Sequence, residues 1–504
     1  MQVILKLPFL VILAGLSAVA MLLPMAHAIR IGDSQTAWVF LDSAVLIALL
    51  TGLIGLATSN YNPENTARSH LIALLGAFVM LPLVLAYPLH FLIPDASYFH
   101  LYFEMVSSLT TTGATLFTDP DRLSEPIHLW RGFVGWLGGF LILVSAISIL
   151  APLNLGGFEV YSAGQNESGE HGISRIRAAD VSERLVGFTL KLGPIYLMAT
   201  ALLAFLLLVS GERWFTAVMH AMSTLSTSGI TARSLTDPGS GGFAAEFFVF
   251  LFLLLAVSRA TFSLDVRTRP LRTLIEDHEF RLMLVFITVL PALLFLRHWV
   301  GAFEVNEGEN TLAALRALWG SMFTVLSFLT TTGFESQFWL AAKDWSGLHT
   351  PGIILLGLVV MGGGVATTAG GIKLLRVYAL YQHGLREMQK LTYPSSIGVS
   401  GRSGRHIRRE GAMIAWLFFM LFAISTAVVM LGLTLTGLEF EASLALAVAA
   451  LSTTGPLAGA VLQGSTDYAT ISDAARAILC AAMVIGRLET LAIIALLNPE
   501  FWRP

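Results

Sequence analysis

The sequence has few charged residues and a single cysteine. Asp, Glu, Lys and Arg make up 12% of its 504 residues, about half the fraction of ordinary soluble domains, which excludes a soluble globular protein. Cys480 stands alone, so no disulfide framework forms within the chain. The twelve histidines are scattered, and neither a nucleophile beside a base, nor metal-ligand spacing, nor a cofactor loop is present. We therefore expect no enzyme, no organic cofactor on this chain and no nucleic-acid partner.

Long hydrophobic runs dominate the remainder. Hydrophobic residues make up 55% of the chain, and its mean hydropathy is +0.74. The runs are apolar on all sides and do not alternate, which predicts membrane-spanning helices of about 20 residues and excludes a barrel. An all-α integral membrane protein in the lipid bilayer follows. Its spans are expected at 8–25, 37–58, 71–92, 131–150, 186–210, 243–264, 279–299, 350–378, 411–433 and 474–497.

Basic residues gather on one side of these spans. With the N-terminus in the cytoplasm, about twenty of the thirty Lys and Arg residues face the cytoplasm, as the positive-inside rule requires. The first run, Leu7 to Met25, precedes Ala26-His27-Ala28 and so imitates a cleavable signal peptide. It is longer than the usual apolar region of about 7–15 residues. We favour a retained helix, with removal of residues 1–28 as the alternative.

Four short Ser/Thr tracts, each ending in glycine, recur along the chain after apolar segments. Their glycines are separated by 116, 104 and 122 residues. One such tract would be uninformative, but four at similar spacing indicate an internal repeat. The first to fourth tracts are, in chain order, Thr110-Thr111-Thr112-Gly113, Ser226-Thr227-Ser228-Gly229, Thr330-Thr331-Thr332-Gly333 and Ser452-Thr453-Thr454-Gly455.

Each repeat is predicted to contain an outer helix, a short pore helix, the tract and an inner helix. Segments such as 319–329 and 441–451 are too short to cross the membrane, which predicts re-entrant helices. The short helices are expected at 98–109, 213–225, 312–329 and 440–451. The four pore repeats then cover 71–150, 186–264, 279–378 and 407–497, and residues 1–58 form an additional N-terminal helix pair.

The tracts have the chemistry of a cation pathway. A ring of backbone oxygens from four segments can replace the hydration shell of a monovalent cation. Small Ser and Thr side chains let four backbones crowd together, glycine accepts positive φ, and each short helix points its negative end at the centre. The alternative, that Ser, Thr and Gly serve helix packing only, accounts for one tract more readily than for four in phase.

The chain resembles the TrkH/KtrB type of potassium transport subunit, within the Trk/Ktr/HKT superfamily. The similarity covers residues 70 to 503 and includes the four tracts, Trp136-Leu137-Gly138-Gly139, Gly370-Gly371-Ile372-Lys373 and Gly486-Arg487-Leu488-Glu489. The N-terminal helix pair is more similar to TrkH than to the shorter KtrB. The resemblance implies four pseudo-repeats around a central pore, a homodimer in the bacterial cytoplasmic (inner) membrane, and a TrkA-like cytosolic nucleotide-binding regulatory subunit.

The resemblance also implies that the four tracts form a selectivity filter that binds potassium ions. A glycine in the first tract accompanies potassium preference in this superfamily, so Gly113 indicates potassium. Two departures from the family pattern bear on the exclusion of sodium. Ile230 follows the second tract, and Pro456 follows the fourth.

Two features are candidates for a gate. The stretch 361–371 holds five glycines, each costing about 1 kcal/mol in a helix relative to alanine, which predicts a helix break at mid-membrane; small-residue packing is the alternative. Arg487 is a costly charge within an apolar span. Glu489 is its candidate partner, and snorkelling of both residues near the helix end is the alternative. Arg259 is a weaker candidate, whose partner would be Asp265 or lipid phosphate. The resemblance implies a blocking intramembrane loop, which assigns the gate to Gly362, Gly363, Gly364, Thr367, Thr368, Gly370, Gly371 and Arg487.

We thus predict potassium uptake through a gated, selective pore, driven by the membrane potential and regulated by a cytosolic subunit. At −100 mV each monovalent cation gains about 2.3 kcal/mol by moving inward. Sodium- or proton-coupled potassium symport, and a less selective K+/Na+ transporter, are the alternatives. The basic segment 373–410 fits both contact with anionic headgroups and docking of the regulatory subunit.

Overall fold

The computed structural model describes residues 7–58, 66–151, 181–237, 240–257, 277–302, 311–348, 350–392, 409–464 and 466–489. Every regular element within these ranges is a helix. Eight helical stretches there are long and apolar enough to cross a membrane. The predicted all-α, multi-pass membrane fold is therefore confirmed.

The helices recur in the order outer, short and inner. The N-terminal helices are α1 (Phe9–Ala20), α2 (Leu22–Ile31) and α3 (Ser34–Thr58). The outer helices are α4 (Thr66–Leu92), α8 (Val181–Val209), α12 (His278–Ala302) and α17 (Arg409–Leu435). The short helices are α5 (Tyr98–Leu109), α9 (Trp214–Ser226), α13 (Thr311–Leu329) and α18 (Phe440–Leu451). The inner segments are α6 (Glu125–Ser145), α10 (Gly242–Val257), α15 (Gly352–Met361) with α16 (Leu374–Thr392), and α20 (Asp473–Leu488).

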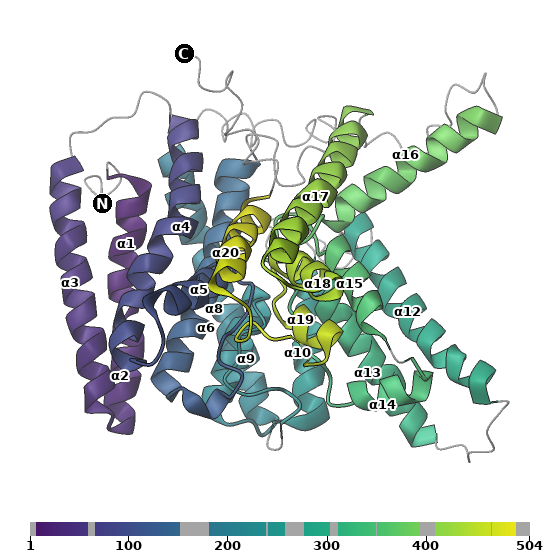
Figure 1. Ribbon diagram of the computed structural model, residues 1–504, viewed down its shortest axis with the longest axis horizontal. Helices are drawn as coiled ribbons and strands as arrows, with labels where there is room; N and C mark the ends of the chain where they lie inside the picture. The colour runs from purple at the N-terminus through teal and green to yellow at the C-terminus, as the bar shows by residue number, and fades with distance from the viewer. Residues whose placement is uncertain are drawn as a thin grey trace.

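This order is consistent with the predicted repeats, whose boundaries stay a prediction. A π-helix, Ala146–Leu150, extends α6, and the short helices α14 (Trp339–Ser346) and α19 (Pro456–Leu462) follow the third and fourth tracts. Figure 1 shows α1, α2 and α3 together at one side of the molecule, and α16 projecting from the other. The N-terminal helices are thus an addition at the edge of the bundle.

Burial separates the inner from the outer helices. In the most apolar stretch of Glu125–Leu150, which contains α6, 67% of the residues are buried, against 22% for Gly411–Leu435 in α17. The outer helices expose large apolar side chains, such as Leu197 and Leu431. In a membrane protein such faces contact acyl chains and need no protein partner. The core therefore lies around the short helices and the tracts.

Two predictions about helix lengths need correction. The third short helix is not short, because α13 spans 19 residues and is itself apolar enough to cross a membrane; what distinguishes it is that it ends directly at a tract. The segment 350–378 is not one helix, because α15 ends at Met361 and α16 begins at Leu374. The helix break predicted at the glycine-rich stretch is confirmed. Residues 258–264 and 490–497, predicted to continue two inner helices, lie outside the described residues.

Candidate functional site

The four tracts lie at the C-terminal ends of the four short helices, in the centre of the protein. α5 ends at Leu109, α13 at Leu329 and α18 at Leu451, each directly before a tract, and the second tract begins with the last residue of α9. Their twelve Ser and Thr residues are all at most 1% exposed. Polar residues are rarely buried so completely without a hydrogen-bonding or binding role.

All four tracts adopt the same backbone turn. The third residue donates its N–H to the carbonyl five positions earlier, and the second residue has positive φ, as in the Schellman ending of a helix. The left-handed position usually holds glycine, because a β-branched residue is strained there by about 1–3 kcal/mol. In all four tracts a threonine occupies this left-handed position. Its φ is 56° at Thr111, 50° at Thr227, 59° at Thr331 and 54° at Thr453. The corresponding N···O distances are 2.8 Å for Thr112–Ser107, 3.0 Å for Ser228–Ser223, 2.9 Å for Thr332–Ser327 and 2.8 Å for Thr454–Ala449.

The tracts close into a ring. A Cβ atom added to the glycine of one tract would collide either with the next tract or with the residue that directly follows that next tract. Each tract therefore contacts the next one in chain order, and the fourth contacts the first. The added atom would lie 2.1 Å from the Ser228 carbonyl oxygen at Gly113, 2.4 Å from the Thr332 carbonyl oxygen at Gly229, 2.8 Å from Pro456 Cβ at Gly333 and 2.2 Å from Ala114 N at Gly455. Glycine is therefore required at these positions by close approach of backbones.

The fourth tract departs from the other three at its glycine. Gly113, Gly229 and Gly333 have positive φ, whereas Gly455 has φ −55° and ψ −42° and is the N-cap of α19. Pro456 is the first residue of that helix, where the fixed φ of proline is well suited. The departure noted in the sequence at Pro456 thus changes the backbone of one quarter of the ring.

Hydroxyl groups within the tracts have two distinct roles. In the first three tracts the first and third hydroxyls bond to each other, over 2.8 Å for Thr110–Thr112, 3.0 Å for Ser226–Ser228 and 3.1 Å for Thr330–Thr332. The second hydroxyls differ. Thr111 Oγ1 and Thr453 Oγ1 are buried without a hydrogen-bond partner in the described part of the chain. These two oxygens are free to serve a ligand.

Behind the first tract lies a buried ion pair that the sequence analysis missed. Glu104 of α5 accepts hydrogen bonds from Arg131 Nε over 3.0 Å, from the Thr115 hydroxyl over 2.9 Å and from the Leu116 N–H. Arg131 of α6 also donates to the Thr115 hydroxyl over 2.8 Å. The Glu104 side chain is 0% exposed. This network ties the segment after Gly113 to two helices at once.

The other tracts are supported by different side chains, which come from different places in their repeats. Six residues before each tract stand Glu104, His220, Thr324 and Leu446. His220 bonds to Glu212 over 3.1 Å and to the Arg233 carbonyl oxygen over 2.9 Å. After the third tract, Ser336 and the Gln337 N–H donate to Glu246 over 2.8 and 2.6 Å. After the fourth, Tyr468 donates to the Gly455 carbonyl oxygen over 3.0 Å.

Glycines of the inner helices let them approach the short helices. A Cβ at Gly138 of α6 would lie 2.0 Å from the carbonyl oxygen of Leu109, the last residue of α5. A Cβ at Gly486 of α20 would lie 2.1 Å from the carbonyl oxygen of Leu451, the last residue of α18. The two contacts correspond to each other, and they explain why glycine stands at Gly138 in the motif 136–139 and at Gly486 in the motif 486–489.

The glycine-rich stretch between α15 and α16 lies directly against three of the four tracts. Gly370 N–H donates to Thr331 Oγ1 over 2.7 Å, and Thr227 Oγ1 lies 3.2 Å from Thr368 Oγ1. A Cβ at Gly370 would lie 2.1 Å from the Ser452 carbonyl oxygen. The stretch also folds on itself, since Gly362 packs against Gly370 and Gly371, Gly363 against Ala369, and Thr367 donates to the Gly364 carbonyl oxygen over 2.8 Å. The candidate gate residues are thus brought together.

Arg487 joins this stretch, but not through its expected partner. Its Nη1 donates to the Thr368 carbonyl oxygen over 2.6 Å, while Nε and Nη2 are buried without a partner among the described residues. Glu489 forms its ion pair with Arg376 of α16 over 2.7 Å, so its pairing with Arg487 was wrong. Lys373 donates to the Ala369 carbonyl oxygen. Arg259 and Asp265 lie outside the described residues.

Comparison with known proteins identifies a family. Residues 38–502 match the TrkH family, described as a cation transport protein. The chain is 30% identical over 436 residues to the Trk system potassium uptake protein TrkI of Halomonas elongata, covering 85% of this chain and 82% of that one. It is 29% identical over 466 residues to TrkH of the same organism, covering 89% and 90%.

A solved structure has the same fold over the whole length. The crystal structure of the potassium transporter TrkH from Vibrio parahaemolyticus matches with a TM-score of 0.80 and 25% sequence identity, covering 100% of both chains. The resemblance seen in the four tracts and the inner-helix motifs is therefore confirmed. The chain belongs to the TrkH family of cation transport proteins.

Proposed function

We propose that this chain is the membrane subunit of a Trk-type potassium uptake system and that K+ passes through the ring of the four tracts. The closed ring of four identical turns is the observation that carries the proposal. Because most first and third hydroxyls bond within their own tract, backbone carbonyls and the free hydroxyls of Thr111 and Thr453 are the oxygens available to a cation. The relatives TrkH and TrkI of Halomonas elongata are named as potassium uptake proteins. Members of a transport family are not enzymes, as expected for this chain.

The membrane potential is a sufficient driving force in this proposal. Each K+ gains about 2.3 kcal/mol per 100 mV on moving inward, and no chemical step is needed. The positive-inside distribution of Lys and Arg supports a cytoplasmic N-terminus, and the proposal places the chain in the bacterial cytoplasmic membrane. A TrkA-like nucleotide-binding subunit on the cytosolic side and a homodimeric assembly complete the proposal, on the strength of the family resemblance.

The stretch 362–371 and Arg487 form the gate in this proposal. The stretch contacts the second residues of the second and third tracts, Thr227 and Thr331, and approaches the fourth tract. In this position it would obstruct one end of the ring. Arg487 binds the same stretch and places a positive charge there. Opening requires that the stretch move away, and α16, which begins at Leu374 directly after it, can transmit that movement from a cytosolic partner.

Arg487→Gln tests the gate. We expect K+ uptake without the regulatory subunit to rise about tenfold, because removing a unit charge from a weakly screened site is worth at least about 1.4 kcal/mol. The variant should fold, since two guanidinium nitrogens already lack partners. Uptake into proteoliposomes is the measurement, with Arg213→Gln, an exposed arginine at the start of α9, as the control. Uptake equal to that of the parent would refute a gating role for Arg487.

Growth of a potassium-uptake-deficient bacterium on low potassium tests the function. We expect rescue by this chain together with a Trk-type regulatory subunit, and K+ uptake that excess Na+ does not suppress. Membrane insertion is verified by immunoblot of the membrane fraction. An inserted chain that fails to rescue growth would contradict potassium uptake. Rescue that requires Na+ or a proton gradient would favour coupled symport, and equal Na+ uptake would favour the less selective transporter.

A further inference from the structure

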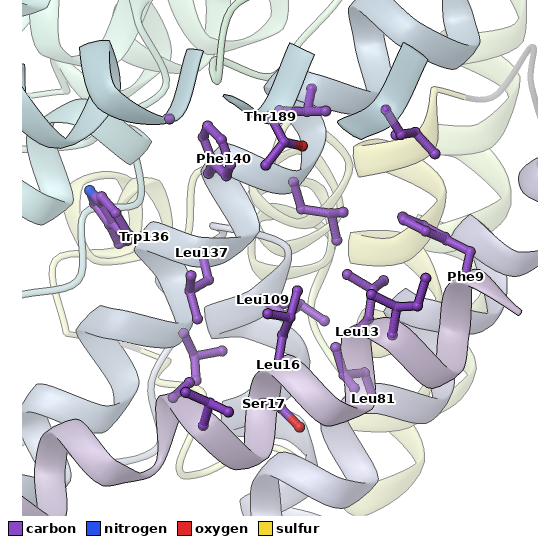
Figure 2. A pocket seen from close by; sticks show the side chains of 18 of the residues that line it. Phe9, Leu13, Leu16, Ser17, Leu81, Leu109, Trp136, Leu137, Phe140 and Thr189 are labelled. Carbon is purple, nitrogen blue, oxygen red and sulfur yellow. The ribbon is translucent and has the colours of Figure 1, made fainter. Parts of the chain in front are cut away.

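An apolar cavity of about 560 Å³ lies between the N-terminal helix α1 and the first two repeats. Figure 2 shows Leu13 and Leu16 of α1, Leu109 of α5, Phe140 of α6 and Thr189 of α8 around it. Its walls come from four of the eight membrane-spanning stretches, namely Phe9–Ile31, Leu71–Leu92, Glu125–Leu150 and Arg184–Val209. This volume is within the range of about 300–1,000 Å³ that is usual for small-molecule binding pockets.

Water is a poor occupant of this cavity. None of the described residues that line it is charged. Ser17 donates to the Ala14 carbonyl oxygen over 2.7 Å, Trp136 to Thr200 over 3.0 Å and Tyr196 to the Trp136 carbonyl oxygen over 3.3 Å. Thr189 adds one further hydroxyl to the lining. A buried water needs two to four polar partners, which one hydroxyl and these engaged groups do not supply. An empty void of this size would forfeit many dispersion contacts. An apolar occupant is therefore required.

The cavity is continuous with the surface that faces the bilayer. Leu16 and Val19 of α1 and Leu190 of α8 line it, yet they are 58%, 64% and 60% exposed. These residues lie on spanning helices, so their exposed faces contact acyl chains. The hydrocarbon of the membrane is thus the apolar material that has access to the cavity.

We propose that the cavity binds one acyl chain of a membrane phospholipid, which inserts between α1 and α8. Its inner wall includes Leu109, the last residue before the first tract, and Leu137, the neighbour of Gly138, which contacts the Leu109 carbonyl oxygen. The bound chain fills the space beside the first tract and supports α5 from the membrane side. The inference does not rest on the proposed transport function.

Filling the cavity from within gives a matched test. Among the described residues, a Cβ at Gly193 of α8 would meet only Phe140 Cζ, at an ordinary 3.6 Å, so Gly193→Phe places its ring in the cavity. Gly187 lies on the same helix and does not line the cavity, and no atom of the described residues lies within 4 Å of an added Cβ. Gly187→Phe is therefore the control.

The direct measurement is electron cryomicroscopy of the parent in nanodiscs of phosphatidylcholine with dibrominated acyl chains. We expect elongated density with bromine signal in the cavity. The proposal would be overturned by any of three results. These are density that continues into residues 1–6 of the chain, density that belongs to a helix of a second copy, and a cavity without density. This result depends on no variant and on no transport assay.

Thermal unfolding in detergent supplies the second measurement. A ligand that binds only the folded state raises its melting temperature, so added phosphatidylcholine should raise the melting temperature of the parent and of Gly187→Phe by several degrees. Gly193→Phe should show a shift less than half as large. Equal shifts in all three proteins would overturn the proposal, whether or not the chain proves to transport potassium.

Discussion

Replacement of Gly113 by serine is expected to lower the ratio of K+ to Na+ uptake by about tenfold to a hundredfold. A Cβ there would lie 2.1 Å from the Ser228 carbonyl oxygen, so the first or the second tract must move by roughly 1 Å to relieve the overlap. In addition, φ at Gly113 is 75°, where a residue other than glycine is strained by about 1–3 kcal/mol. Cation selectivity depends on the number and field strength of the oxygens in the ring, and this change disturbs two neighbouring segments together.

The control separates crowding from backbone strain. Gly437, in the turn between α17 and α18, has φ +95°, and within the part of the chain that the structure describes no atom lies within 4 Å of an added Cβ. Gly437→Ser therefore imposes comparable left-handed strain without a collision, and it should leave the K+/Na+ ratio unchanged. Uptake of both ions into proteoliposomes is the measurement. If Gly113→Ser keeps the parental ratio while remaining folded, the ring of tracts does not set selectivity.

Glu104→Ala is expected to cost about 3–5 kcal/mol of stability, the usual loss when one partner of a buried ion pair is removed. Arg131 would be left as an uncompensated charge, and the Leu116 N–H would lose its acceptor. Glu104→Gln keeps an acceptor of the same shape and should be milder. Unfolding temperature in detergent and folded yield after size-exclusion chromatography measure the effect. Glu441→Gln, an exposed glutamate in the first turn of α18, is the control.

A double variant distinguishes stability from positioning. Replacing a buried ion pair with apolar residues of similar volume is often neutral or stabilising, so Glu104→Leu with Arg131→Met should recover the folded yield. It should not recover the K+/Na+ ratio, because nothing then ties Thr115 and Leu116 to α5 and α6. A double variant with parental selectivity would show that the network serves stability alone. A parental melting temperature in Glu104→Ala would contradict the stabilising role altogether.

The supports of the four tracts show where the repeats differ. The turns are the same in all four tracts, yet an ion pair supports the first, a histidine–glutamate contact the second, Glu246 the third and Tyr468 the fourth. Each supporting group holds backbone from outside the ring. The four quarters of the ring therefore share a turn but differ in the groups that hold it, and the fourth also differs in the backbone of its glycine.

Much of the fold was predictable because it depends on local properties of the chain. The short helices predicted at 98–109 and 440–451 coincide with α5 and α18, since hydropathy and the Ser/Thr-Gly ending mark both of their limits. The break at 361–371 was predictable because several glycines in one helix are costly wherever they occur. The four tracts were recognisable because recurrence at similar spacing needs no knowledge of the fold. Glu104, Arg131 and Glu246 carried a usable signal, as charges inside apolar segments.

Composition, hydropathy and recurrence by themselves determined a membrane protein of helices with four matching tracts. Only the tertiary structure decided which tract meets which, that Glu489 pairs with Arg376 and not with Arg487, and that a cavity opens between α1 and α8. It also decided that Gly455, unlike the glycines of the other three tracts, has a right-handed backbone conformation, because Pro456 begins a helix there. The physical reason is the separation along the chain of the residues that interact. Helix formation and insertion follow from neighbouring residues, whereas these contacts join residues far apart in the chain, whose meeting depends on how all the helices pack.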